Sequence, residues 1–552
     1  MSKSDKIPTF DKNLVMNLEN IHPKDALEKV DQDIFEAIRL FQKNRFEDAL
    51  ALVMKNVATD ANHSIAASFM LFAKALTALD LGEVGKATDA FNLTTDVADA
   101  QNGKSGVLGS TSKELKWINK RSSAVTGTAN CTKAGLYLMQ ASITNLIKAG
   151  LCIMKGIHTI ESDYKSMDKI PKNKLRDVMD ENTEGNLQLV IGAINIITGF
   201  LPPIILKFIG VFGYTSDLKL GYGAMHDCEQ GNSFYGEMAP LFLLGFQAVR
   251  MGVAPGTTSA AVHDEMKTRL RKLGKEHSKF CIFLIIYNWF KRHDRNLKQS
   301  ITILQKAVAS KYEWKGIKCL VDLELLVSLL FSGDYKNAAV AATDLQHEEV
   351  WAQPFLAYCA AASKDMTKEA KLSSYDEARF MTNRRFIGRI IPPEQFAIKR
   401  IEYFNNLKPA CGMTVDEIRR LHLPGLEVAF MFLGFAYKNL KQLTADLSLV
   451  EDALEKAKPL NLKSLNNHLN LMKFSLMRHI NVVNKTYDLD LLDIVEDMEK
   501  DEINWIKPMS VLEQAHLHFD AFMLTKNPVY KEKTLQLFKE TKKSSGYIYE
   551  YL

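Results

Sequence analysis

One ten-residue pattern, which occurs four times in two pairs, constrains the fold of this 552-residue chain more than any other feature. The first pair consists of NRFEDALALV, starting at Asn44, and GEVGKATDAF, starting at Gly82. The second pair consists of RNLKQSITIL, starting at Arg295, and GDYKNAAVAA, starting at Gly333, so the copies in each pair are 38 residues apart. A period of this length is typical of helix–turn–helix units that stack into solenoids.

The four copies share three positions: an apolar residue at +2, a small residue at +5 and an apolar residue at +9. In chain order these are Phe46, Ala49 and Val53; Val84, Ala87 and Phe91; Leu297, Ser300 and Leu304; and Tyr335, Ala338 and Ala342. We interpret the +2 residue as filling the space between the two helices of a unit, and the +5 residue as allowing them to approach closely. The +9 residue then contacts the next unit, while Gly82 and Gly333 suit a tight turn.

The remaining segments also favour helices. Apolar residues recur at i, i+3, i+4 and i+7 along most of the chain, whereas strand-like alternation bounded by hairpin turns is nearly absent. The 15 prolines fall mostly near expected helix ends. We therefore predict an all-α fold, an α-solenoid of degenerate repeats whose turn SGDYKNA is most similar to the tetratricopeptide turn.

The length exceeds what one compact core usually holds, so we expect two halves. Residues 1–30 are predicted to form an N-terminal extension, and residues 31–250 an N-terminal helical-repeat half. Within that half, residues 101–133 are rich in Gly, Ser, Thr and Lys and are predicted to be a flexible insert. A loop containing Pro255 and Gly256 leads to the C-terminal helical-repeat half, predicted at residues 265–545.

One stretch raises the question of a membrane anchor, because residues 189–206 read LVIGAINIITGFLPPIIL without a charge. Pro202 and Pro203 cannot continue a helix begun at Leu189. The stretch is therefore predicted to divide into one helix ending near Phe200 and a second starting at the proline pair. Each is too short to span a bilayer, so we predict a buried hairpin and no transmembrane helix.

Composition narrows the class of protein further. A net charge of +5 from 70 basic and 65 acidic residues gives no basis for nucleic-acid binding. The seven cysteines are scattered without a C-x-x-C pair, which favours reduced thiols, and the start MSKSDKIPTF lacks the apolar core of a signal peptide. We expect a cytoplasmic protein.

Motifs that could carry chemistry are incomplete. GYGAMHDCEQG holds Gly221 and Gly223 but lacks the third glycine of a dinucleotide loop, so a structural turn is the simpler interpretation. DLDLLDIVEDME has carboxylates at three calcium-loop positions, but Asp493 occupies the position that requires glycine. We interpret it as an acidic helix face.

The histidines do not form a predicted metal site either. His516 and His518 are two residues apart and would lie on different faces of a helix. Three His-Asp dipeptides resemble the metal pairs of phosphohydrolases, but no second histidine cluster supports them: His226-Asp227, His263-Asp264 and His293-Asp294. No catalytic residue, cofactor or metal is predicted.

The segment RLRKLGKEHSK, residues 269–279, is the densest basic run. It could sit against anionic lipid head groups. The simpler interpretation is a helix whose long cationic side chains cover a buried neighbouring helix, and both interpretations stay open here.

The order of several segments resembles the tetratricopeptide repeat protein 39 family, which includes fungal inclusion-body clearance proteins of the mitochondrial outer membrane and cytosol. The segments, which span about residues 30 to 535, are FQKNRFEDAL, FMLFAKALTALD, AGLYLMQASITNLIKAGLCIMKGI, FLPPIILKFIGVFGYTSD, FSGDYKNA, WAQPFLAYCAAA, IPPEQFAIKR and LPGLEVAFMFLGFAYK. The resemblance implies an α-solenoid without known catalytic activity that acts through protein partners. Members are placed in the cytosol, in the nucleus and at organelle or lipid-droplet surfaces, and the 101–133 segment looks longer than usual for them.

We therefore predict that the chain is not an enzyme but a scaffold or adaptor that binds protein partners through a concave groove. Its candidate partner-binding residues, taken from the repeat register, are Phe72, Tyr287, Lys291, Asp322, Leu326 and Trp351. The alternative is a peripheral membrane or lipid-droplet-surface protein, which would bind lipid or an apolar ligand through residues 189–249 and the basic run. In that case the mitochondrial outer membrane is a further possible location.

Overall fold

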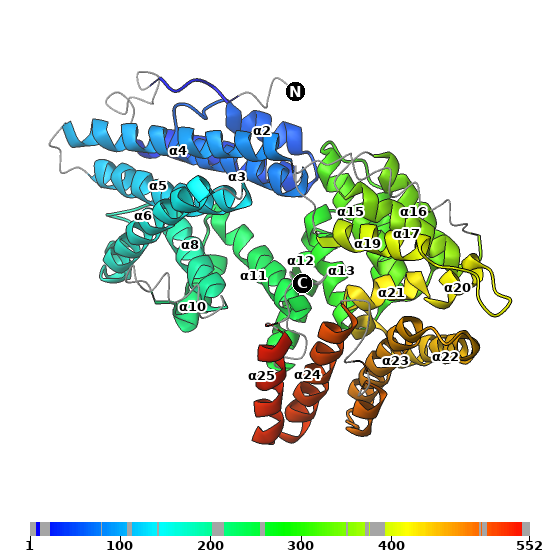
Figure 1. The fold of residues 1–552 in the computed structure, drawn as a ribbon. Coiled ribbons are helices and arrows are strands. Elements are labelled where there is room, and N and C mark those ends of the chain that lie inside the picture. The colour runs from blue at the N-terminus through cyan, green and yellow to red at the C-terminus, as the bar shows by residue number, and fades with distance from the viewer. Residues whose placement is uncertain are drawn as a thin grey trace. The chain divides into compact units, whose positions relative to one another are not determined.

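The computed structural model describes residues 7–11, 23–78, 80–107, 113–140, 143–200, 215–253, 260–348, 352–369, 375, 392–495, 498, 505–541 and 543. Within these residues every regular element is a helix, apart from one isolated bridge between Ala410 and Met413 (Figure 1). The all-α prediction is confirmed.

The chain divides into two compact units. Unit 1 comprises Met1–Ile286 and Lys311–Ile317, and unit 2 comprises Tyr287–Ser310 and Lys318–Leu552. The predicted boundary loop around Pro255 lies outside the described residues, so the division into halves at 31–250 and 265–545 stays a prediction.

Unit 1 is built from successive helices that pack against their sequence neighbours, most extensively α3 on α4, α4 on α5 and α5 on α6. Its helices are α1 (Pro23–Gln42), α2 (Phe46–Met54), α3 (Ala61–Ala78), α4 (Leu81–Val107), α5 (Lys113–Met139), α6 (Ile143–Asp168), α7 (Lys172–Leu175), α8 (Glu181–Gly199), α10 (Leu218–Gln230), α11 (Phe234–Val253) and α12 (Ala260–Glu276). Helix α13 (Cys281–His293) begins in unit 1 and ends in unit 2.

Unit 2 has one continuous apolar core that runs from Leu297 to Leu517. Its helices are α14 (Leu297–Val308), α15 (Lys315–Ser332), which begins in unit 1, α16 (Tyr335–His347), α17 (Gln353–Met366), α19 (Pro392–Asn405), α20 (Val415–Leu421), α21 (Pro424–Met431), α22 (Leu440–Ala457), α23 (Lys463–Asn484), α24 (Ile506–Thr525) and α25 (Pro528–Thr541). Short 3₁₀ helices cover Gly434–Tyr437, Lys458–Leu460 and Asp490–Ile494.

The repeat pattern corresponds to a definite turn in three of its four copies. Asn44, Arg295 and Gly333 all have left-handed backbone conformations, with φ of 62°, 57° and 80°. In these three copies the +2 residue is the first residue of the helix that follows the turn, namely α2, α14 or α16. Every +2, +5 and +9 residue in the four copies is at most 2% exposed except Tyr335, which is partly buried against the core.

The copy at Gly82 differs from the other three. Helix α4 already begins at Leu81, and the carboxylate of Asp80 accepts the backbone N–H of Glu83 at 3.0 Å. Gly82 therefore lies in the first helical turn rather than in a tight turn, because an N-terminal aspartate satisfies the free backbone donors there.

The prediction of a flexible insert at 101–133 is wrong for the residues that the structure describes, since α4 continues to Val107 and α5 begins at Lys113. The small residues of α5 serve close packing on α6 and α8. A Cβ at Gly127 would lie 2.8 Å from Ile160, and the buried Thr128 hydroxyl donates to Asn186 at 2.6 Å. Gly, Ser and Thr thus shorten the distance between helices, whereas in a loop they would add freedom.

The uncharged stretch begins as predicted. Helix α8 ends at Gly199, with Phe200 as its C-terminal cap, and two buried polar side chains, Asn195 and Thr198, hydrogen-bond within the helix to Ile191 and Ile194. The second predicted helix falls in 201–214, outside the described residues. Among the described helices, none combines the length and apolarity needed to cross a membrane.

Candidate functional site

Three of the candidate partner-binding residues, Tyr287, Lys291 and Asp322, lie half-buried in unit 2 on α13 and α15. Lys291 follows Tyr287 by one helical turn, and its Nζ lies 5.1 Å from the centroid of the Tyr287 ring. The amine is thus held over an aromatic face, a contact that contributes about 0.5–1 kcal/mol at an exposed site. Both groups keep surface that a partner can contact.

A polar network fixes α13 against α14 and α15 behind that pair. The Asn288 side chain donates to Glu324 at 3.1 Å, and its carbonyl accepts the hydroxyls of Ser300 and Ser328. Arg292 forms an ion pair with the same Glu324 carboxylate. Because buried polar groups require partners, this network specifies how the three helices align.

Asp322 lies on α15 in a chain of charges. The Lys318 Nζ is 3.0 Å from the Asp322 carboxylate and 2.9 Å from that of Glu348. Burial raises the pKa of Asp322, and the nearby Lys318 ammonium opposes that effect. Charges of both signs are therefore available on α15, which suits a polar partner.

The other candidates are placed differently. Leu326 is completely buried in the core of unit 2, so its side chain offers no surface to a partner, and its assignment to a groove needs correction. Leu326 lies on the side of α15 that also carries the core residues Leu329 and Leu330. The repeat register alone does not distinguish this buried side from a side that faces a groove. Phe72 is half-buried in unit 1, where its ring lies edge-on to Phe91 with centroids 6.4 Å apart. Trp351 lies outside the described residues.

A buried cluster of charged and polar side chains was not predicted from the sequence, although its residues come from three of the segments on which the family resemblance rests. Tyr358 comes from WAQPFLAYCAAA, Arg400 from IPPEQFAIKR and Glu427 from LPGLEVAFMF. The Arg400 Nε lies 2.9 Å from a Glu427 carboxylate oxygen, and the Tyr358 hydroxyl is 3.5 Å from the other. The available signal was Glu427, the one charge of the apolar helix α21, because a charge in such a segment requires a buried partner.

Two histidines complete this cluster. The His422 Nδ1 lies 3.4 Å from the Arg400 guanidinium, and the His468 Nε2 lies 3.1 Å from the backbone carbonyl of His422. Burial, with the Arg400 charge, lowers the pKa of His468 to about 3. Burial also raises the pKa of Glu427 to about 7, an effect that the Arg400 charge opposes. These groups link α17, α19, α21 and α23 without facing solvent.

A second ion pair lies next to this cluster. Arg419 contacts Asp365 through Nε at 2.6 Å and Nη2 at 2.8 Å, while the Tyr375 hydroxyl donates to Asp365 at 2.6 Å. The Arg419 guanidinium also lies 5.0 Å from the Tyr375 ring centroid. Such a two-point contact fixes orientation as well as distance.

Unit 1 has its own buried network. Arg121 on α5 donates to both carboxylate oxygens of Asp31 on α1, at 3.2 and 2.8 Å, and to Asp180 at 3.3 Å. Asn62 and Asn182 also donate to Asp31. Burial raises the pKa of Asp31, and the Arg121 charge opposes that effect. The network joins four helices, α1, α3, α5 and α8.

The sequence motifs tested for chemistry take structural positions. Gly221 lies within α10 in close contact with α8, where a Cβ would be 3.0 Å from Asn195. His516 lies 3.5 Å from Glu513, whereas the His518 ring stacks on Tyr530, so the two histidines point to different partners. In the described part of the chain no three potential metal ligands come together.

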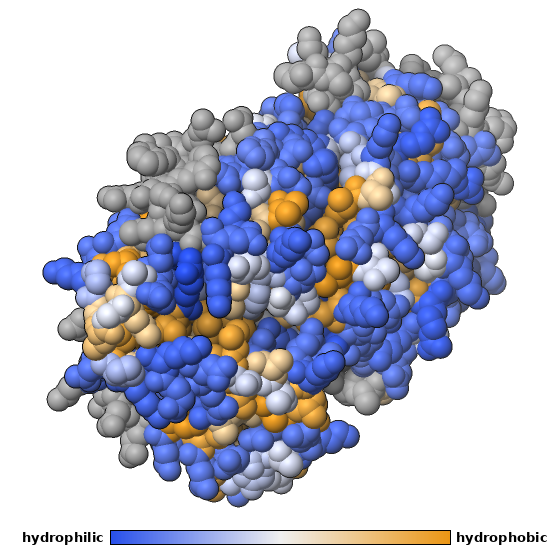
Figure 2. Space-filling view, turned by 90° about the vertical axis from the view of Figure 1, so that its right-hand side faces the viewer, coloured by the Kyte–Doolittle hydropathy of each residue, from blue (hydrophilic) through white to orange (hydrophobic). Residues whose placement is uncertain are grey.

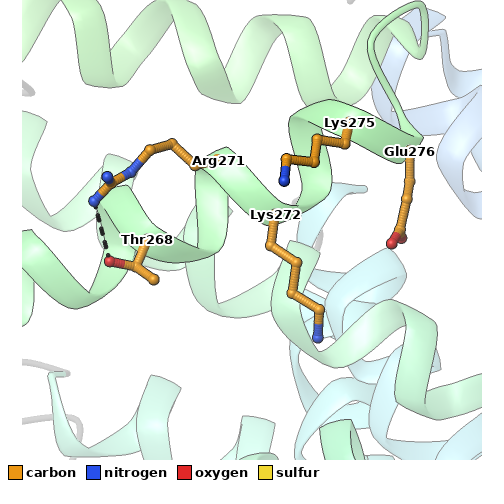
Figure 3. Close-up of a pocket in the computed structure, with 5 residues that line it drawn as sticks. All are labelled: Thr268, Arg271, Lys272, Lys275 and Glu276. Atoms are coloured by element: carbon orange, nitrogen blue, oxygen red, sulfur yellow. Dashed lines mark hydrogen bonds between the residues drawn. The ribbon is translucent and has the colours of Figure 1, made fainter.

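Residues 269–276 of the basic run form the second half of α12, and residues 277–279 follow the helix. Met266, Leu270 and Leu273 face the interior and are at most 6% exposed. On the opposite side lies an open surface depression lined by Thr268, Arg271, Lys272, Lys275 and Glu276 (Figure 3). The Arg271 side chain folds back along the helix, and its Nη2 donates to the Thr268 hydroxyl at 3.3 Å.

Exposed apolar residues are a separate feature of unit 1. Several lie at the C-terminal ends of α8 and α11 and the start of α10, with exposures of 37–52%: Ile197, Phe200, Leu218, Leu220, Tyr222 and Val249. The Phe200 ring contacts Phe246 and lies under the Arg250 guanidinium. On the face of the molecule drawn in Figure 2, hydrophilic residues predominate and hydrophobic residues form bands between them.

Comparison with known proteins identifies the family of this helical-repeat chain. A family model described as Iml2/Tetratricopeptide repeat protein 39 matches residues 35–479. The match includes the repeat turns and the buried cluster around Arg400 and Glu427. No solved structure matches the chain. This chain belongs to the Iml2/Tetratricopeptide repeat protein 39 family.

Proposed function

We propose that this chain is a non-catalytic scaffold or adaptor that binds protein partners through the exposed sides of α13 and α15. The family is one of helical repeats, and such repeats commonly bind other proteins through the helices of successive units. Phe72 and Trp351 stay candidates for further contacts, on the repeat register alone.

One observation carries the proposal: Tyr287, Lys291 and Asp322 keep exposed surface while the side chains beside them are fixed in a buried network. Asn288, next to Tyr287, is completely buried, and the Glu324 side chain that it contacts is 12% exposed. A partner would therefore meet a prepositioned aromatic ring and charges of both signs. Binding to such a surface loses little side-chain freedom.

The test is quantitative affinity purification of the full chain with its charges exchanged at this surface. Lys291→Glu combined with Asp322→Lys should lose a defined subset of partners that the wild type retains. The matched control is Lys456→Glu with Asp452→Lys on α22, where both side chains are exposed. If the first variant keeps every partner that the control keeps, the proposed surface is wrong.

A second candidate function rests on the exposed apolar residues at the ends of α8, α10 and α11. Phe200 is 43% and Val249 52% exposed, and apolar surface of this kind can contact a lipid surface or an apolar ligand. A cytoplasmic protein with peripheral contact to the mitochondrial outer membrane or lipid droplets fits this candidate. The basic run on α12 could add only charge, because its own apolar side is buried.

Flotation with liposomes or artificial lipid droplets separates the two candidates. Lipid contact predicts that wild type floats and that Phe200→Ser with Val249→Ser shifts it to the bottom fraction. Wild type that stays wholly at the bottom with every lipid mixture rules out the second candidate and leaves the first intact.

A further inference from the structure

The exposed side of α12 has cations that form no ion pair within the described part of the chain. Arg271, Lys272 and Lys275 are exposed and form no ion pair with any described residue. Arg269 in the same helix gives the contrast, because it is only 12% exposed and pairs with Glu229 and Glu265. Of these four cations, one joins the helix to α10 and three face solvent.

The three cations are spaced so that they can act together. Arg271 and Lys275 are one helical turn apart, as are Lys272 and Lys275, and such positions lie about 5–6 Å from each other on a helix surface. Thr268 and Glu276 bound the same depression at its two ends (Figure 3). The depression therefore presents positive charge in the middle, a hydroxyl at one end and a carboxylate at the other.

An anionic membrane fits this surface poorly. A basic amphipathic helix binds a bilayer by inserting its apolar side, but Met266, Leu270 and Leu273 are already buried in unit 1. Clusters of about 4–8 basic residues bind anionic lipid by charge alone, but in this run Arg269 is already paired with Glu229 and Glu265. The carboxylates of Glu265 and Glu276, 55% and 63% exposed, would in addition be repelled by anionic lipid. Both observations favour a smaller partner that can meet the cations individually.

We propose that the α12 depression is a docking site for an acidic peptide segment of another protein. Carboxylates three or four residues apart on a helical segment would pair with Arg271, Lys272 and Lys275. A hydrogen-bonding side chain would meet Thr268, and Glu276 would exclude a further acidic residue at that end. This site is distinct from the surface of α13 and α15 and does not depend on it.

The test uses the full chain and fluorescence anisotropy with a labelled 15-residue peptide whose Glu residues recur every three or four positions. The same peptide with Gln in place of Glu is the peptide control. The site variant combines Arg271→Glu, Lys272→Glu and Lys275→Glu. The matched protein control reverses three exposed lysines of α25, Lys531→Glu, Lys533→Glu and Lys539→Glu, which changes the net charge equally.

The wild type should prefer the Glu peptide, and the site variant should bind it at least about tenfold more weakly at low salt, as expected when three exposed ion pairs are lost. The α25 control should bind like the wild type. Equal loss in both triple variants would indicate net charge alone and overturn the site. Equal binding of the Glu and Gln peptides would overturn it as well.

Two further measurements keep the outcome clear. Circular dichroism and thermal unfolding check that the site variant folds, and Arg271→Gln with Lys272→Gln and Lys275→Gln replaces it if it does not. Vesicles containing phosphatidylserine test the lipid alternative: vesicle binding that depends on the three cations, without peptide binding, would refute the proposal. The Lys291→Glu and Asp322→Lys variant should bind the peptide normally, so failure of the partner surface on α13 and α15 leaves this result unaffected.

Discussion

Arg400 and Glu427 form an ion pair that is withdrawn from solvent: Nε lies 2.9 Å from Oε1, and neither side chain is more than 1% exposed. Removing one partner leaves the other charge buried and unpaired. Arg400→Met should therefore lower the free energy of unfolding of unit 2 by about 3–5 kcal/mol, measured by urea unfolding.

A double variant and a surface pair test whether the buried charge is the cause. Arg400→Met with Glu427→Met should recover most of the loss, because no charge is then left in the core. At the exposed pair Lys458–Glu455, with side chains 67% and 69% exposed, Lys458→Met should change stability by less than about 1 kcal/mol. Similar losses at both pairs would argue against this explanation.

The two histidines of this cluster, together with the buried His479 on α23, predict how acid affects unit 2. Burial lowers the pKa of His422, His468 and His479, so these histidines take up protons near pH 6.5 only after unfolding. Their contribution to stability is present above that pH and is lost as the pH falls. Glu427, whose raised pKa of about 7 reflects burial, acts in the opposite sense: its contribution is present below about pH 4.5 and is lost as the pH rises through 7.

Three histidines outweigh one carboxyl, so unit 2 should become less stable between pH 7 and pH 5. Each histidine contributes a slope of up to about 1.4 kcal/mol per pH unit. His468→Gln keeps a donor for the His422 carbonyl and should reduce the slope, measured as the urea midpoint against pH. His347→Gln, at an exposed position, is the control and should leave the slope unchanged.

Gly425 connects the LPGLE segment to a repeat turn. A Cβ at this position would lie 2.7 Å from Tyr335 and 2.7 Å from Met366. Gly425→Ala should thus cost about 1–3 kcal/mol through overpacking, seen as a lower melting temperature. Gly223→Ala in α10, where a Cβ meets nothing within 4 Å, should be neutral or stabilising by up to about 1 kcal/mol.

Arg121 offers a test confined to unit 1. Arg121→Met leaves Asp31 and Asp180 buried without their shared cation, which should cost about 3–5 kcal/mol. Hydrogen exchange should quicken in α1, α5 and α8, while α22 and α23 in unit 2 keep their protection. Faster exchange in all five helices would mean that the two units unfold together.

Periodicity was sufficient to predict the helical class and the buried repeat positions, because apolar residues at 3.6-residue spacing and a small residue at +5 have few other uses. It failed where side chains are polar but buried. In helix α5, Thr128 and Asn130 are buried on the side that faces the core. A prediction based on hydrophobicity assigns such polar residues to a loop. Leu326 shows the converse, since an apolar residue in a helical register does not reveal whether it faces the core or a groove.

The buried cluster was hidden for a different reason. Arg400 lies 27 positions before Glu427 and 22 before His422, and local spacing carries no information about such pairing. Only the single charge of Glu427 within the apolar α21 indicated that a partner must exist.

The position of Asp31 has a consequence for how the chain is made on the ribosome. Its carboxylate is neutralised by Arg121, 90 residues later, and hydrogen-bonded by Asn182, 151 residues later. At about 5–20 residues per second, roughly 8–30 s pass between synthesis of Asp31 and of Asn182. Throughout that interval α1 holds a carboxylate that has no complete set of partners, so α1 is among the last helices of unit 1 to be secured although it precedes them in the chain. Secure packing of α1 therefore depends on residues that are synthesised only with α8.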